Sequence, residues 1–158
     1  MQFLNYILAS VISYLGLIAG MLLIFMGPEE KRPGTKYFIL MQKVVFLMIM
    51  FFFLYYYNLN IYLIIVLMAI LILLSFYVEI RKPERQYIIY ILLGIIFYLS
   101  SRDIGSFITE ASLIFIYGIP TASLLTDIGK KKRMKSLKGI LKYSYFIVIA
   151  SALYFFFS

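Results

Sequence analysis

Apolar residues form long stretches along the chain, separated by short polar segments. At about 20 predominantly apolar residues per membrane crossing, the pattern predicts six spans, at residues 3–26, 38–57, 61–78, 87–100, 104–126 and 143–158. The fourth and sixth are short for a crossing, so we expect flanking residues to extend them. The sequence therefore predicts an all-α, polytopic membrane bundle of six transmembrane helices, which forms a single transmembrane domain over residues 1–158.

Most basic residues occur in the segments that follow the first, third and fifth spans. The segments on the opposite side of the predicted bundle carry Arg102 alone. Short loops rich in Lys and Arg stay on the cytoplasmic side of a membrane. We therefore expect a multi-pass protein of the cell membrane with both termini outside.

A sequence similarity links the first two basic segments. Residues 29–37 read EEKRPGTKY, residues 79–87 read EIRKPERQY, and the third basic segment ends about one more period along the chain, at Lys142-Tyr143. One hypothesis is that the chain consists of three tandem helical hairpins, packed with approximate threefold symmetry. The alternative is that inner loops independently attract Lys, Arg, Pro and Tyr.

The third basic segment, KKKRMKSLKGILKY, has a helical pattern. Its apolar residues Met134, Leu137 and Leu141 recur at helical spacing beside a basic face, which predicts a short basic interfacial helix. The residues expected to contact anionic lipid headgroups are Lys131, Lys132, Arg133, Lys135, Lys138 and Lys142. The alternative is that these charges serve only to orient the chain.

Small residues form a stripe along the first span. Ala9, Ser13, Gly16 and Gly20 follow one another at steps of three and four residues. Such a stripe, and the Gly16-x-x-x-Gly20 pair in particular, lets another helix approach closely in lipid. The sequence leaves open whether this helix belongs to the same chain or to a second copy.

The fifth span carries a carboxylate where hydrocarbon is expected. Glu110 shares one helical face with Ser106, Tyr117 and Thr121, and Gly118 and Pro120 interrupt the helical pattern. Because an ionised carboxylate facing lipid costs at least a few kcal/mol, Glu110 should face the bundle interior or water, or be protonated. We expect no direct ion pair with Lys43, which enters the membrane from the opposite side.

Composition limits the chemistry that the chain can perform. Of the 158 residues, 64% are apolar and 14% charged, and there is no Cys and no His. Thiol catalysis, haem ligation by imidazole and the usual zinc sites are therefore excluded. We expect no enzymatic activity, no cofactor and no metal site. The net charge of +8 collects in the predicted inner loops, which argues against nucleic acid as a partner.

Two functional hypotheses remain. The first is a non-catalytic membrane subunit or scaffold that packs against partner helices, of another membrane protein or of a second copy, and against anionic lipid. The alternative is a small transporter or channel-like protein that uses Glu110 and a break at Gly118 and Pro120 as an ion or solute site. The shortness of the chain and its few polar groups within the spans favour the first.

Overall fold

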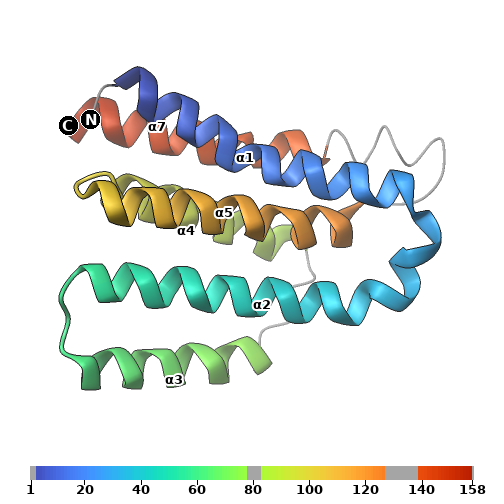
Figure 1. Cartoon of the computed structure of the whole chain (residues 1–158), viewed down its shortest axis with the longest axis horizontal. Helices are drawn as coiled ribbons and strands as arrows, with labels where there is room; N and C mark the ends of the chain where they lie inside the picture. Colours follow the sequence, from blue (N-terminus) through green and yellow to red (C-terminus); the bar gives the residue numbers. More distant parts are fainter. Residues whose placement is uncertain (1–2, 78–82, 127–138, 158) are drawn as a thin grey trace.

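The computed structural model describes residues 3–77, 83–126 and 139–157, and these are almost entirely helical (Figure 1). No strand occurs among them, so the predicted all-α class is confirmed. The helices are α1 (Phe3–Met26), η1 (Pro28–Glu30), α2 (Lys31–Tyr56), α3 (Ile61–Tyr77), α4 (Pro83–Ser100), α5 (Ile104–Leu125), η2 (Lys142–Ser144) and α7 (Tyr145–Phe157). The predicted basic interfacial helix falls largely on residues outside the described ones.

The predicted boundary that differs most is the start of the second span. We expected a loop over residues 27–37, whereas α2 begins at Lys31. Pro33 does not prevent this, because the first N–H groups of a helix have no partner within the helix. Pro83 likewise occupies the first position of α4.

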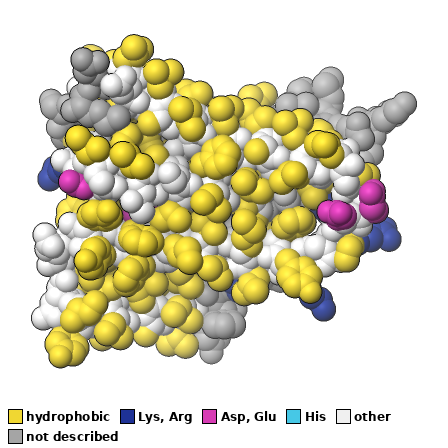
Figure 2. Space-filling model, viewed as in Figure 1, with side chains coloured by type: hydrophobic (Ala, Val, Ile, Leu, Met, Phe, Trp, Pro, Cys, Tyr) yellow, Lys and Arg dark blue, Asp and Glu magenta, His cyan; other side chains and the backbone are white. Residues whose placement is uncertain are grey.

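Four helical segments are long and apolar enough to cross a membrane: Phe3–Met26, Pro28–Tyr56, Ile104–Leu125 and Gly139–Phe156. Among the residues whose side chains are described, the apolar stretches of α3 and α4 are shorter, Ile61–Leu73 and Gln86–Ser100. Figure 2 shows hydrophobic side chains over the middle of one face of the molecule and charged side chains near its two ends. This surface is compatible with a membrane protein.

The helices run back and forth along the long axis, and α5 lies between α1 and α2 (Figure 1). The principal contacts are those of α5 with α1 and α2, followed by those between α4 and α7. Helices joined by a short turn are therefore not the ones that pack most closely. The hypothesis of three self-contained hairpins with threefold symmetry is wrong for this arrangement, because α5 separates the two helices of the first pair.

Glycine makes the contact between α1 and α5 possible. A Cβ atom added to Gly16 would lie 1.9 Å from the carbonyl oxygen of Phe115, and one added to Gly20 would lie 2.1 Å from that of Ile119. On the facing side, a Cβ atom at Gly118 would meet the carbonyl carbon of Gly16 at 2.7 Å. The two backbones therefore touch, and the helix that approaches the glycine stripe belongs to the same chain.

Hydroxyl groups add hydrogen bonds along the same helix pair. The Ser13 hydroxyl donates to the carbonyl of Ala111 at 3.0 Å, and the Ser123 hydroxyl donates to the carbonyl of Gly20 at 3.2 Å. Without water in the hydrocarbon, such bonds add to the van der Waals contact that holds helices together.

The core continues from this pair to the other helices through aromatic side chains. Tyr6 of α1 stacks on Tyr154 of α7 with ring centroids 4.3 Å apart, and its hydroxyl donates to the carbonyl of Ala150 at 3.1 Å. Phe97 of α4 lies 4.9 Å from Phe107 of α5, centroid to centroid. One buried cluster thus joins α1, α2, α4, α5 and α7.

Helix α3 lies outside this cluster and packs mainly against α2. Among residues 61–73, whose side chains the structure describes, Ile64 alone is buried. Every residue in that stretch is apolar, so the exposed surface of α3 is hydrophobic on all sides. An element of this kind faces lipid or another apolar helix.

We expect Gly16→Ala to destabilise the fold by about 1–3 kcal/mol, because its methyl group overpacks a backbone contact that cannot yield locally. Gly139→Ala is the matched control, since a Cβ atom there has nothing within 4 Å. Thermal unfolding in detergent, followed by circular dichroism, measures both. Equal melting temperatures for Gly16→Ala and the parent would contradict the α1–α5 contact.

Candidate functional site

The polar residues predicted on the fifth span all point into the bundle. Ser106 is 4% exposed, and Glu110, Tyr117 and Thr121 are fully buried on α5. They do not form one site, however. Tyr117 and Thr121 belong to a hydrogen-bonded cluster toward the end of the bundle opposite the termini, and Glu110 lies apart from it.

The cluster joins three helices through four side chains. The Gln42 amide nitrogen, on α2, donates to the Thr121 hydroxyl at 2.8 Å and to the Tyr117 hydroxyl at 3.3 Å. Tyr117 in turn donates to the side-chain carbonyl oxygen of Gln86, on α4, at 3.3 Å. All four side chains are at most 2% exposed. We call Gln42, Gln86, Tyr117 and Thr121 the polar cluster.

Three residues of the polar cluster, Gln42, Tyr117 and Thr121, donate hydrogen bonds to acceptors on neighbouring residues. Both amide hydrogens of Gln42 are used, and the Thr121 hydroxyl donates to the carbonyl of Tyr117 at 2.8 Å. A network satisfied in this way stabilises helix packing and fixes which faces of α2, α4 and α5 meet.

Sequence reasoning missed the two glutamines. Neither Gln42 nor Gln86 is among the candidate site residues that the sequence patterns predict. The available signal was that Gln42 is uncharged and lies inside a predicted span. Each polar atom of an amide within hydrocarbon needs a hydrogen-bond partner, and side chains on neighbouring helices are the first candidates for that partner.

Gly118 and Pro120 do not break α5. The helix continues through both residues to Leu125, so the expected break is wrong. Gly118 instead allows close helix packing, because the backbone of α1 lies where a side chain at this position would be. Pro120 is buried within α5. The carbonyl of the preceding residue, Ile119, accepts a hydrogen bond from the Ser123 hydroxyl at 2.9 Å.

Glu110 is fully buried, and neither of its carboxylate oxygens has a hydrogen-bond partner among the described residues. One turn earlier Phe107 contacts Tyr6 and Phe97, and one turn later Ile114 is 1% exposed. The surroundings along this face are thus largely apolar, and an ionised carboxylate would be costly there.

Three surface cavities can be described, and Glu110 lines none of them. The largest lies between the α2–α3 turn and the start of α5, a smaller one lies beside it, and the third is a groove between α1 and α5. Among the described residues, no group of three or more carboxylates is placed to hold a metal ion. The wet midplane cavity that a transporter needs is not among these three cavities.

Of the basic residues expected to contact lipid, the described part of the chain includes Lys142, in η2, which is exposed. The others, Lys131, Lys132, Arg133, Lys135 and Lys138, lie outside the described residues. Lys31 reaches the same region, where its ammonium group donates to the carbonyl of Thr126 at the end of α5. This contact ties the start of α2 to the end of α5.

No family model, curated protein or solved structure matches this chain. Its function must therefore be argued from its own residues.

The buried Glu110 carboxyl group, which has no hydrogen-bond partner among the described residues, should lower the free energy of unfolding. We expect Glu110→Leu to raise the free energy of unfolding by about 1–3 kcal/mol, because a buried polar group without a partner is removed. Thr121→Val is the control, since it removes a buried polar group that is bonded and should destabilise. Chemical or thermal unfolding in detergent measures both. A destabilised Glu110→Leu variant would mean that this carboxyl group has a partner.

Proposed function

We propose that the protein crosses the cell membrane six times, with both termini outside, and acts there as a non-catalytic subunit or scaffold. Two features support the crossings. The helices alternate in direction, and the two termini lie together at one end of the molecule (Figure 1). The described helix ends that flank the three segments richest in Lys and Arg lie toward the other end, which is consistent with the positive-inside rule for cytoplasmic loops.

The scaffold role rests on the position of α3. This helix is apolar on every described side and touches little besides α2. In lipid no hydrophobic force holds such a helix against its neighbour, because the lipid tails are as apolar as the side chains. We infer that α3 packs against a partner membrane helix.

The interior of the bundle supports the same role. Apolar side chains from α1, α2, α4, α5 and α7 form one buried cluster, and hydrogen bonds link the four side chains of the polar cluster. Such an interior holds helices in place rather than passing a solute. The exposed charges Arg32, Lys36 and Lys142 lie at the proposed cytoplasmic end, where they favour anionic headgroups.

Transport remains a second candidate because of one observation. Glu110 is a fully buried acidic side chain with no hydrogen-bond partner in the part of the chain that the structure describes, and such groups in membrane proteins often mark ion or proton pathways. If this candidate is right, Glu110→Leu abolishes a proton or cation flux in reconstituted vesicles. If the scaffold role is right, the same variant leaves every measured flux unchanged.

A photo-crosslinking amino acid placed in native membranes tests the scaffold role. Val66 on α3 and Val148 on α7 are 58% and 59% exposed, so they form a matched pair. We expect position 66 to give a discrete protein adduct and position 148 to give lipid adducts. The crosslinked protein should also copurify with the unmodified chain in a fixed ratio. Lipid adducts alone at position 66 would contradict the role assigned to α3.

A further inference from the structure

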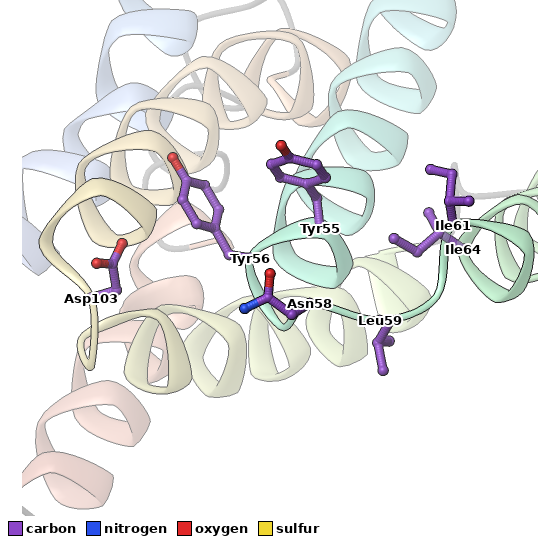
Figure 3. Close-up of a pocket in the computed structure, with 7 residues that line it drawn as sticks. All are labelled: Tyr55, Tyr56, Asn58, Leu59, Ile61, Ile64 and Asp103. Atoms are coloured by element: carbon purple, nitrogen blue, oxygen red, sulfur yellow. The ribbon is translucent and has the colours of Figure 1, made fainter.

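The largest described cavity opens at the end of the bundle that carries the termini. It has a volume of about 540 Å³ and is lined by Tyr55, Tyr56, Asn58, Leu59, Ile61, Ile64 and Asp103 (Figure 3). This volume is within the range of sites for small ligands, about 300–1,000 Å³. We call it the tyrosine cavity.

The α2–α3 turn builds one wall of the tyrosine cavity. Asn58 has a φ of 52°, in the left-handed region, and its N–H donates to the carbonyl of Tyr55 at 3.0 Å. Asn adopts this conformation more readily than most residues, and it ends α2 sharply. The turn therefore brings an amide side chain beside the rings of Tyr55 and Tyr56, as Figure 3 shows.

The opposite wall carries a fixed negative charge. Asp103 caps α5, and its Oδ2 atom accepts a hydrogen bond from the N–H of Ser106 at 2.7 Å. A Cβ atom added to Gly105 would lie 3.2 Å from this oxygen and 3.6 Å from the Tyr56 hydroxyl. The carboxylate and the phenol thus border the same small space, which the absence of a side chain at Gly105 leaves open.

A second cavity adjoins the tyrosine cavity and supplies the opposite charge. It has a volume of about 150 Å³, and its lining includes Arg102 as well as Tyr56 and Asp103, which both cavities share. Arg102 and Asp103 are the charged side chains that the α4–α5 turn contributes at this end. A carboxylate beside Tyr56 and the guanidinium group of the preceding residue therefore give this end of the molecule a zwitterionic surface.

The chemistry of the tyrosine cavity favours an organic cation. Aromatic faces attract alkylammonium groups, and a carboxylate strengthens this preference and repels anions. The phenol and amide groups can accept hydrogen bonds from an N–H or O–H of the same ligand. We propose that the tyrosine cavity binds an alkylammonium group, either of a free amine or of an amine-bearing lipid headgroup whose phosphate contacts Arg102.

Asp103→Asn separates binding from folding, because Asn caps a helix as well as Asp does but carries no charge. Choline chloride and ethanolamine hydrochloride, titrated against sodium chloride of equal ionic strength, probe the free amine by calorimetry. Protein in nanodiscs of phosphatidylethanolamine and phosphatidylglycerol, analysed by native mass spectrometry, probes the headgroup. Glu29→Gln, which changes an exposed acid at the other end, is the charge-matched control.

We expect Asp103→Asn to weaken alkylammonium binding about tenfold, a typical effect of losing one ionic partner. Its retention of phosphatidylglycerol, which the basic segments attract, should not change. Tyr56→Leu should weaken binding further than Tyr56→Phe, because Phe keeps the ring. Tyr62→Leu, on an exposed ring outside the cavity, should have no effect.

The two probes distinguish the source of the ammonium group. Binding of choline or ethanolamine in detergent indicates a free amine, whereas retention of phosphatidylethanolamine without binding of either amine indicates a lipid headgroup. Equal behaviour of Asp103→Asn and the parent protein in both assays would overturn the proposal. Failure of the parent to bind any of the probes would overturn it as well.

Discussion

The close approach of α1 and α5 determines where the other helices lie. Glycines on both helices bring the backbones into contact, so α5 enters the space beside α1 that α2 would otherwise occupy. From this central position α5 contacts α2 and α4, and α7 closes the bundle against α1 and α4. Contacts of this kind, close van der Waals packing and interhelical hydrogen bonds, are the ones that hold helices together in membrane proteins.

Two kinds of buried polar group then mark different parts of the same helix. Tyr117 and Thr121 find partners on α2 and α4, and their bonds select one rotation of each helix. Glu110 finds none among the described residues. The hydrogen-bonded groups fix which helix faces meet, whereas the unpaired carboxyl group lowers the stability of the bundle. A scaffold that gains nothing from Glu110 should become more stable when that residue is replaced.

Sequence patterns predicted individual helices better than their packing. Span ends agree closely where polar residues bound an apolar stretch, as for α1 and α5, because the length of apolar chain is itself the signal. The start of α2 was missed because Pro33 and Gly34 resemble a loop, although a first turn tolerates them. The glycine stripe indicated a close contact without naming the partner helix. The partners of Gln42 and Gln86 on α5 could not be predicted either, because a single sequence does not reveal which helices meet.

Helix α5 runs between the two ends of the molecule. Asp103 caps its first turn, and Lys31 of α2 donates a hydrogen bond to the carbonyl of Thr126 at its last turn. The account therefore depends on α5, and not α2, being the neighbour of α1. The natural chain has no Cys, so pairs of introduced cysteines test this directly. Ile12 and Ser112 line one groove between α1 and α5, and Val44 is on α2. A short bifunctional thiol reagent should crosslink the pair at positions 12 and 112 in native membranes and leave the pair at positions 12 and 44 unlinked. Crosslinking of 12 with 44, and none of 12 with 112, would contradict the account.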